Sequence, residues 1–530
     1  MGEKKEKKSS IVAVELAKEQ KQVSVSEFFL KNRHLLGFDN PIKALSTTVK
    51  ELVDNSLDAC EEMQILPEVI TQIKQTGENK YVVIVEDNGP GIVKKQIPNV
   101  FARLLYGSKF GAQKQSRGQQ GIGVSASVLY GQLTTGKPAK ITSRIDPKHP
   151  AHYYELHIDT SKNEPEVVAD KEVEWLNKAH GTKVEIELEG KYQRGKLGVE
   201  EYLKQVAIAN PHTEIVFIGP AGEKIIHRRS AKEPPPQPKK IKPHPYGIEL
   251  GLLIRMLKQT KARTVQQFFT TEFSRATPAV VKQIAEKAQI SANAKPAELM
   301  HQQVDAIFRA IKQVKIMAPP TDCLSPIGEA ILVDALKNGI HADFFASTTR
   351  SPAVYRGIPF QVEAAIAYGG DLPQEDFIEL IRFANKVPLQ HQKSACAMTK
   401  AVIGTSWKNY GLQQSKSALP TGPVVLVVHI ASVWVPFTSE SKEAIAHYPE
   451  IMREVKLALQ EVGRKLGMYM RKTVRMNEQR ERASLFEAYI PELASSLASI
   501  TKEGKTEIMQ HLQKRLKKDL PLLMGEKKDD

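Results

Sequence analysis

The chain has 530 residues, of which 41% are hydrophobic and 25% charged, and its formal net charge is +15. This length favours about three to four domains, and without a run of about eighteen apolar residues we expect no membrane-spanning segment. The three cysteines lack the CxxC spacing of zinc sites, which argues against zinc and disulfides and is typical of a cytoplasmic protein. The positive charge favours a polyanionic partner, nucleic acid first, although a solvated basic surface is the alternative.

Residues 25–230 are expected to form one α+β domain, preceded by a charged, flexible arm over residues 1–24. The valine-rich run YVVIVED, residues 81–87, predicts a strand, and AKITSRI, HYYELHID and TKVEIELE are further strand-like runs. Helical patterns cover residues 42–60, 96–106 and 121–132. This mixed order favours helices packed on a mostly antiparallel sheet.

A proline-rich segment, residues 231–246, separates this domain from the rest. Its stretch AKEPPPQPKKIKPHP has six prolines, which fix φ and remove hydrogen-bond donors, so an extended linker is expected. Residues 247–318 then read as wholly helical. TVQQFFTTEF and PAVVKQIAEKA predict two short helices, the second starting at Pro278.

An α/β pattern returns in residues 319–475, where PFQVEAAIAYGG and GPVVLVVHIASVWVPF are strand-rich. From Ser441 to about Arg482, apolar residues keep helical spacing between basic ones. We therefore expect a long helix that starts in this domain and leads into a C-terminal helical segment, residues 476–530.

The predicted helix over residues 42–60 is unusual because KELVDNSLDAC contains three carboxylates and an amide within a short stretch. On a helical wheel, Glu51, Asn55 and Asp58 share a narrow arc opposite the apolar side. A solvent-exposed face is the commonest meaning of such a pattern. Glu51 and Asn55, however, are one turn apart and point together, as two groups of one binding site would.

Three glycine-containing segments accompany this helix. The strand YVVIVE leads into DNGPG, where glycines admit a ligand to the backbone and Asp87 can accept hydrogen bonds. SRGQQGIGVSASV has three glycines before a helical pattern, and the free N–H groups of a helix start bind anions. Gly181 and Thr182 precede a further strand. Each segment alone is also explained as a turn or a flexible loop.

Taken together, ExxxN on a helix, DxGxG after a strand, GxxGxG before a helix and GT before a strand resemble the GHKL ATPase superfamily. This superfamily includes gyrase-type topoisomerases, MutL, histidine kinases and heat-shock chaperones. The sequence has no GxxxxGK[ST] of a Walker site, and GQQGIG lacks the preceding strand of a Rossmann fingerprint. The resemblance implies an α/β-sandwich (Bergerat) ATPase fold that binds ATP with Mg²⁺.

The resemblance also implies roles for single residues. Glu51 matches the general base that activates the attacking water, and Asn55 matches the ligand of Mg²⁺. Asp87 matches the acceptor of the adenine amino group, while Gly89 and Gly91 let the ring approach. The other predicted ATP-binding residues are Ser108, Lys109, Gly118, Gln119, Gln120, Gly121, Ile122, Gly123, Val124, Ser125 and Thr182.

Longer stretches, among them FARLLYGSKF, SPIGEAILVDAL and RGIPFQVEAAIAYGG, resemble the B-subunit family of DNA topoisomerase VI, a type IIB enzyme. This resemblance, over about residues 25–475, implies a helix-two-turn-helix domain for residues 247–318 and a transducer domain for residues 319–475. It also implies that Lys442 in SESKEAIA reaches the γ-phosphate as a catalytic and ATP-binding residue. Without the resemblance, Lys442 reads as a surface lysine at a helix start.

The same resemblance implies a gate function. Two B subunits would bind ATP, dimerise around a double-stranded DNA segment, and drive its passage through a break in a second duplex. The topoisomerase VI A subunit would make that break, within an A2B2 heterotetramer. The sequence has no DxD motif of a cleavage site, so this chain is not expected to cut DNA alone.

Direct DNA contacts are predicted at two basic segments. WKNYG interleaves Trp407, Lys408 and Tyr410, a mixture that suits nucleic acid, although Trp407 fits a protein core equally well. KYQRGK places Lys191 and Arg194 in a basic loop. Contacts of this kind would be to phosphates and largely independent of base sequence.

Two other functions stay open at this point. The first is a GHKL ATPase of the chaperone or mismatch-repair type, against which the helical segment over residues 247–318 argues. The second is a DNA-binding scaffold with a vestigial nucleotide site, against which the presence of Glu51 and Asn55 argues. A sensor kinase is disfavoured because no phospho-acceptor histidine helix precedes the nucleotide motifs.

Overall fold

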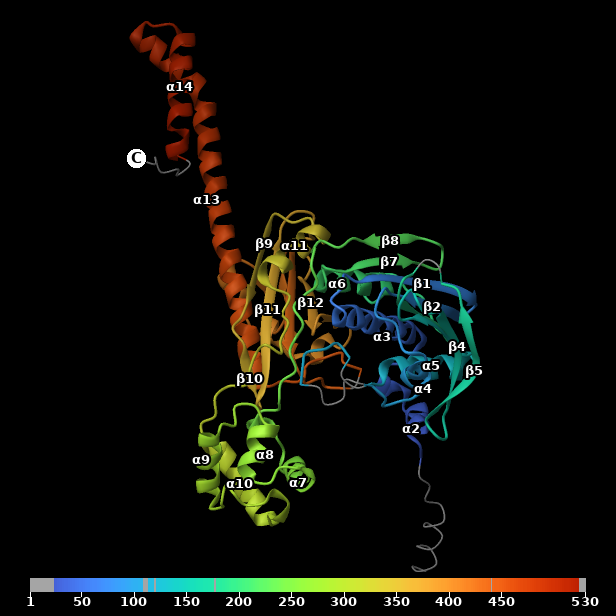
Figure 1. The fold of residues 1–530 in the computed structure, drawn as a ribbon. Helices are drawn as coiled ribbons and strands as arrows, with labels where there is room; N and C mark the ends of the chain where they lie inside the picture. Colours follow the sequence, from blue (N-terminus) through green and yellow to red (C-terminus); the bar gives the residue numbers. More distant parts are fainter. Residues whose placement is uncertain (1–22, 108–112, 119–120, 176–177, 440, 524–530) are drawn as a thin grey trace, which may run out of the picture.

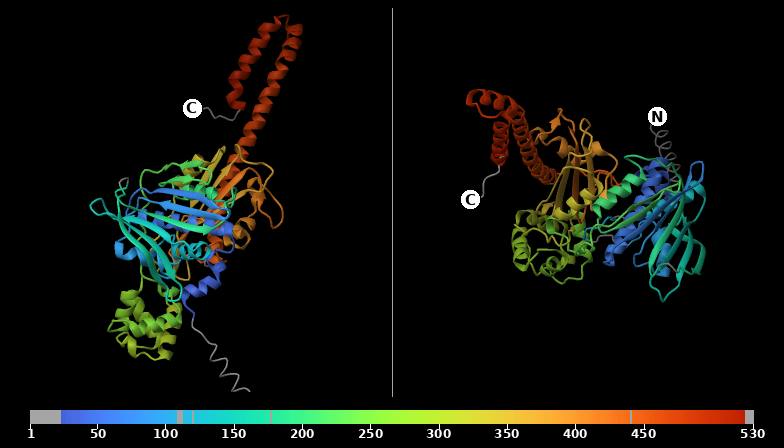
Figure 2. Two further views of the ribbon diagram at one scale, coloured as in Figure 1. Left: turned by 90° about the vertical axis from the view of Figure 1, so that its right-hand side faces the viewer. Right: turned by 90° about the horizontal axis from the view of Figure 1, so that it is seen from above.

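The computed structural model describes residues 23–107, 113–118, 121–175, 178–439 and 441–523. Two sheets with their helices lie side by side, and a small helical group and a long helical hairpin lie at opposite ends (Figures 1 and 2). No helix within the described ranges is long and apolar enough to cross a membrane.

The N-terminal sheet has eight strands among the described residues, in the order β5-β4-β3-β6-β2-β1-β7-β8. Only β1 and β7 pair in parallel, so the prediction of a mostly antiparallel sheet is confirmed. The strands are β1 (Glu68–Gly77), β2 (Lys80–Glu86), β3 (Ala139–Arg144), β4 (Ala151–Asp159), β5 (Glu164–Val173), β6 (Gly181–Glu189), β7 (Glu214–Ile218) and β8 (Lys224–His227).

Helix α3 (Pro41–Glu62) is the helix that carries the acidic residues. It starts where the Asn40 side chain accepts a hydrogen bond from the N–H of Lys43, with Pro41 in the first turn. Its apolar side, including Leu45 and Val49, is buried in the core of the N-terminal sheet. The neighbouring helices are α2 (Val25–Lys31), η1 (Arg33–Leu36), η2 (Lys94–Gln96), α4 (Ile97–Ala102), α5 (Gly123–Thr135) and α6 (Val199–Ala209).

The proline-rich segment contains neither helix nor strand over residues 231–244, and it is not free of the N-terminal part. The side chain of Gln237 donates to the carbonyls of Glu61 and Glu62 at the end of α3. The N–H of Ile241 donates to the carbonyl of Gln113. The segment therefore lies along the N-terminal part before it enters the helical group.

The helical group has its own small apolar core. Its helices are η3 (Pro245–Gly247), α7 (Leu250–Gln259), α8 (Val265–Glu272), α9 (Pro278–Ala288), η4 (Pro296–Glu298) and α10 (His301–Gln313). The hydroxyls of Thr264 and Thr277 cap α8 and α9, and Pro278 begins α9 as the sequence predicts.

The C-terminal sheet is formed around the fully buried strand β16 (Val424–Ser432). In the described chain its order is β10-β11-β16-β12-β13, with β9 also paired to β11. The other elements are α11 (Glu329–Gly339), β9 (Phe344–Thr349), β10 (Ala353–Tyr355), β11 (Ile358–Tyr368), β12 (Glu379–Ala384), β13 (Val387–Pro388), η5 (Lys393–Ala395), α12 (Ala397–Ile403), η6 (Trp407–Tyr410), β14 (Gln413–Gln414) and β15 (Pro420–Thr421).

Both faces of the C-terminal sheet are covered. One face packs against α12 and the first half of α13 (Pro449–Thr501). The other face packs against α11 and against Ile208 and Ala209 of α6, which belongs to the N-terminal part. The C-terminal sheet therefore shares a buried apolar contact with the N-terminal part, through α6.

The predicted start of the long helix at Ser441 is wrong, because α13 begins at Pro449. Residues 441–448 form a loop in which Lys442 has a left-handed φ of 53° and Ile445 bridges to Phe437. Helix α13 then runs to Thr501, and α14 (Lys505–Leu523) folds back along it (Figure 2).

Candidate nucleotide-binding site

A cavity of about 310 Å³ lies between α3, α5 and the N-terminal sheet. Two loops of the C-terminal part, residues 388–391 and 441–443, complete its wall. Much of the wall is apolar, with Ile92, Val184 and Ile122 among the lining residues. The cavity is therefore shared between the two sheets of the molecule.

Helix α3 presents Glu51 and Asn55 to this cavity, one helical turn apart. Glu51 rests against the first residue of α5, because a Cβ built on Gly123 would lie only 1.7 Å from Oε2 of Glu51. Backbone N–H groups at a helix start lack partners within the helix and attract negative charge. Glycine at position 123 thus leaves room for the carboxylate.

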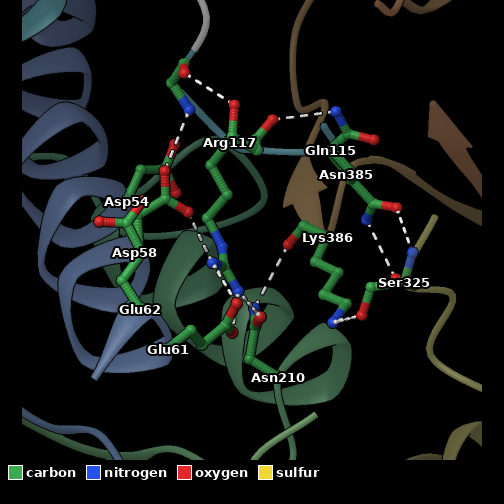
Figure 3. Close-up of polar contacts among 12 residues, drawn as sticks. Asp54, Asp58, Glu61, Glu62, Gln115, Arg117, Asn210, Ser325, Asn385 and Lys386 are labelled. Atoms are coloured by element: carbon green, nitrogen blue, oxygen red, sulfur yellow. Dashed lines mark hydrogen bonds and ion pairs between the residues drawn. The ribbon is translucent and has the colours of Figure 1, made fainter. Parts of the chain in front are cut away.

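The two other carboxylates of the stretch KELVDNSLDAC, Asp54 and Asp58, are buried, so this arc of the helix is not a solvent-exposed face. Asp54 accepts a hydrogen bond from the Tyr202 hydroxyl at 3.1 Å. Burial raises the pKa of Asp54 to about 6, although the positive charge of Lys50 acts in the other direction. Asp58 forms an ion pair with Arg117 at 2.8 Å (Figure 3).

Asp87 lies buried at the end of β2 and lines the cavity. Its Oδ1 accepts hydrogen bonds from the N–H groups of Gly89 (2.9 Å) and Thr182 (3.1 Å), and its Oδ2 accepts one from Ser56 (2.8 Å). Burial raises the pKa of Asp87, and these three hydrogen bonds oppose that shift. Since a carboxylate has about four acceptor positions, Oδ2 can accept one further donor from the cavity.

The DNGPG turn needs glycine at position 91. Gly91 has a φ of 69°, and a Cβ there would lie 2.0 Å from the carbonyl oxygen of Arg144. Gly91 lines the cavity, whereas Gly89 packs against Asp87 and Ala59 behind it. The turn thus fixes Asp87 at the cavity wall.

The glycine-rich segment before α5 borders the cavity with Gly118, Gly121, Ile122, Gly123 and Val124. Ser125 is instead buried, and its hydroxyl donates to the Ile122 carbonyl. Thr182 lines the cavity. Four predicted site residues fall outside the described residues: Ser108, Lys109, Gln119 and Gln120.

Lys442 lies at the cavity wall, on the loop before α13 and not at a helix start. Its neighbour Glu443 is buried and forms an ion pair with Lys43 of α3 at 2.6 Å. Burial acts to lower the pKa of Lys43, but its contacts with Asp39 and Glu443 outweigh this effect and raise it. The ion pair holds the Lys442 loop against the first turns of α3.

Sequence reasoning missed several cavity residues. Lys50 precedes Glu51 on α3, and Gln390 and His391 come from the C-terminal sheet. Arg117, whose guanidinium is buried against Asp58 and Glu61, was also missed. Two features of the sequence could have indicated Arg117: it lies just before the glycine-rich segment, and Asp58 on α3 had no assigned partner.

The predicted DNA contacts divide into buried and exposed residues. The prediction for Trp407 is wrong, since its side chain is fully buried and its indole N–H donates to the Val402 carbonyl at 2.9 Å. Tyr410 packs against the core beside α13. Lys408, Lys191 and Arg194 are exposed.

Two family models match the chain. The model described as histidine kinase-, DNA gyrase B-, and HSP90-like ATPase covers residues 40–191, and the model described as topoisomerase VI B subunit, transducer, covers residues 319–482. The type 2 DNA topoisomerase 6 B subunit of Methanococcoides burtonii is 50% identical over 94% of this chain and 80% of its own length. That of Archaeoglobus fulgidus is 45% identical over 92% and 81%.

The chain belongs to the B-subunit family of type 2 DNA topoisomerase 6. Family membership confirms the predicted fold class, with a GHKL ATPase sandwich, a transducer and a long C-terminal helix. The region matched by the ATPase model contributes Glu51, Asn55 and Asp87 to the cavity, and the region matched by the transducer model contributes Lys442.

Proposed function

We propose that the chain is the ATP-binding and ATP-hydrolysing gate subunit of a type IIB DNA topoisomerase. The observation that carries the proposal is that one cavity brings together Glu51 and Asn55 of α3, the buried Asp87 and the transducer residue Lys442. The names of the two relatives, as B subunits of type 2 DNA topoisomerase 6, support the same function.

The cavity fits a purine nucleotide. The remaining acceptor position of Asp87 suits the amino group of adenine, and the apolar lining suits the faces of the ring. The glycine-rich segment and the start of α5 offer backbone N–H groups to phosphate oxygens. These features select ATP by its base and bind it by its phosphates.

Asn55 fits a magnesium ion that is held mainly by phosphates. Its side chain is exposed in the cavity, and no group of three His, Cys, Asp or Glu within the described ranges is arranged to hold a metal. Mg²⁺ prefers oxygen ligands, keeps several waters and often takes only one or two ligands from the protein. When bound, it supplies neutralisation of phosphate charge.

In the proposed hydrolysis, Glu51 and Lys442 each have one role. Glu51 orients a water molecule for attack on the γ-phosphorus and takes its proton, while the bond from the γ-phosphorus to the bridging oxygen breaks and ADP leaves; the start of α5 lies beside the carboxylate. Lys442 contributes positive charge at the same phosphate. Because Lys442 belongs to the transducer, loss of the γ-phosphate changes what holds the transducer loop at the cavity.

The proposed function also implies a domain organisation and an assembly with other subunits. Residues 25–230 form the ATPase domain, 247–318 the helix-two-turn-helix domain and 319–475 the transducer domain. Two chains dimerise on ATP and enclose a DNA duplex, and the A subunit, named here the cleaving subunit, cuts DNA in an A2B2 enzyme. Lys408, Lys191 and Arg194 are the exposed basic residues assigned to DNA phosphates.

Sedimentation of the full chain tests the gate directly, with Mg²⁺ and a non-hydrolysable ATP analogue or without nucleotide. We expect a shift from monomer to dimer with the analogue. A Glu51→Ala chain should give the same shift with ATP itself, and it should not turn ATP over. Analogue binding without a change in mass would contradict dimerisation by this chain alone, and absence of binding would favour the scaffold alternative.

A further inference from the structure

Residues 113–117, named here the root segment, lead into the glycine-rich segment and are held largely by distant parts of the chain. The N–H of Gln115 donates to the Cys323 carbonyl at 3.1 Å. The Gln115 side chain exchanges two hydrogen bonds with the backbone of Ser325, at 3.0 and 2.6 Å. Cys323 and Ser325 both lie in the transducer region, outside residues 40–191.

A second transducer contact comes from the turn between β12 and β13. The amide of Asn385 donates to the Ser116 carbonyl and to the Ser432 carbonyl, both at 2.9 Å. Its oxygen accepts from the N–H of Ser432 at 2.9 Å. One side chain therefore joins the root segment to β16, the central strand of the transducer sheet.

Lys386, the next residue of this turn, is also buried. Its ammonium donates to the Ser325 hydroxyl at 3.2 Å, and its backbone N–H donates to His429 at 3.1 Å. His429 in turn pairs with the buried Glu363 at 2.7 Å. Burial lowers the pKa of Lys386, and the negative charge of Glu61 opposes that shift.

The backbone of the turn makes a lysine at position 386 unexpected. Asn385 and Lys386 have φ values of 49° and 68°, and a two-residue turn with two positive φ values favours Asn followed by Gly. A lysine in this conformation is strained, and strained residues persist where the surroundings hold them and often serve a function. The side chain of Lys386 is therefore the feature to explain.

The root segment is tied to the ATPase side by Arg117 (Figure 3). Its guanidinium binds Asp58 at 2.8 Å, Glu61 at 2.6 and 3.0 Å, and the side-chain oxygen of Asn210. Asn210 also donates to the Lys386 carbonyl at 3.3 Å. The buried cations Arg117 and Lys386, from different regions, thus both lie near Asp58 and Glu61 in the last turns of α3.

We propose that Asn385 and Lys386 are positioning residues for nucleotide binding, which hold the root segment so that the glycine-rich segment meets the phosphates. Through them the position of that segment depends on the transducer sheet, by a contact separate from the Lys442 loop. The proposal rests on the proposed ATP site, because it assigns the phosphates to the glycine-rich segment.

The test is Lys386→Met in the full chain, which keeps most of the length of the unbranched side chain and removes the ammonium. The amide of Gln115 should exchange with deuterium faster than in the unchanged chain, also without nucleotide. The dissociation constant for a non-hydrolysable ATP analogue with Mg²⁺, and KM for ATP, should rise on the order of tenfold, the effect of one buried charged hydrogen bond. The value of kcat should change much less.

Two further variants separate positioning from general damage. Lys386→Gly suits the left-handed backbone and should show the same exchange and binding effects with an intact fold. Lys465→Met is the matched control, since its ammonium donates to the Ser347 carbonyl on the transducer away from the root segment. It should leave exchange of Gln115 and analogue binding unchanged.

Folded Lys386→Met and Lys386→Gly chains with unchanged Gln115 exchange and unchanged analogue binding would overturn the proposal. If the unchanged chain did not bind the analogue, the proposed function would fail instead. The exchange comparison without nucleotide would then still decide whether Lys386 positions the root segment.

Discussion

At the scale of single residues, the contact between Glu51 and Gly123 limits the positions that the Glu51 carboxylate can occupy. The carboxylate occupies space that any side chain at position 123 would need. Its position is therefore set by a glycine on another element as much as by α3. Small changes at position 123 should act on chemistry more than on folding.

Gly123→Ala is expected to fold and bind nucleotide but to lose turnover. The added methyl group meets the flexible end of Glu51, which can move aside at little cost in stability. A displacement of about 1 Å of a catalytic group can cost on the order of a hundredfold in rate. Steady-state kcat and melting temperature are the measurements.

Gly251→Ala is the matched control, because a Cβ at Gly251 of α7 meets open space. A Glu51→Ala, Gly123→Ala double variant should lose no more activity than Glu51→Ala alone. Additive losses would show that Gly123 acts on something other than Glu51.

Asp54 predicts a pH dependence of stability. Its pKa rises from 3.8 to about 6 on folding, so the folded state binds the proton more tightly than the unfolded state. The stabilisation is complete below pH 3.8 and is lost as the pH rises through about 6. One pKa unit corresponds to about 1.4 kcal/mol, so the loss is roughly 3 kcal/mol.

Urea unfolding of the unchanged chain and of Asp54→Asn measures this effect. The difference in the free energy of unfolding between the two chains should change between pH 4 and 6 and stay constant above pH 7. Parallel curves over the whole range would mean that Asp54 keeps an ordinary pKa in the folded chain.

At the scale of elements, the loop before α13 joins the transducer to the nucleotide cavity. Lys442 reaches the cavity, while Glu443 anchors the loop through Lys43 of α3. The proposed catalytic lysine and the anchor of its loop thus occupy adjacent positions. The two side chains can be removed separately.

Lys442→Ala should weaken nucleotide-driven dimerisation and abolish strand passage in the assembled enzyme, because the transducer would lose its proposed contact with the γ-phosphate. Glu443→Gln should also reduce dimerisation and strand passage, but to a smaller extent, since Lys43 keeps its ion pair with Asp39. ATPase and relaxation assays of the assembled enzyme measure both. An unchanged rate and unchanged strand passage in Lys442→Ala would contradict the role of Lys442.

The elements differ in how well the sequence predicts them. Helix α3 follows a helical periodicity and strand β2 is a valine-rich apolar run, and both were predicted closely. Strand β5 was missed because most of its side chains are exposed, so no apolar alternation marks it. The start of α13 was misplaced because SKEAIA has helical spacing, while the loop is held by tertiary contacts such as the Lys43–Glu443 ion pair.

The same distinction applies to the site. Glu51, Asn55 and Asp87 belong to short local motifs, so their place could be predicted. Arg117 was missed because its partners Asp58 and Glu61 lie far away in sequence. The burial of Trp407 likewise depends on its packing beside α12 and α13, which the local sequence pattern does not predict.

At the scale of the whole molecule, the far part of α13 carries apolar side chains that the chain itself leaves exposed. Leu485, Phe486 and Tyr489 are each more than half exposed. Exposed apolar residues of this size gathered on one helix mark a contact surface. We expect this surface to bind the cleaving subunit of the proposed function.

Leu485→Glu together with Phe486→Glu should reduce binding of the cleaving subunit at least about tenfold, because charges would enter an apolar contact. ATP turnover by the isolated chain should not change, since both residues lie far from the cavity. Pull-down with the cleaving subunit, together with an ATPase assay, measures the two outcomes. Intact binding in the pull-down would place the contact elsewhere.

The length of α13 has a mechanical consequence. Its contact with the transducer core ends near Met470, and residues 471–501 continue as helix beyond it (Figure 1). At 1.5 Å per residue this part is a lever arm of about 45 Å. A tilt of about 10° at its base displaces its tip by roughly 8 Å, so the lever magnifies small rotations of the transducer core into movements as large as a protein side chain.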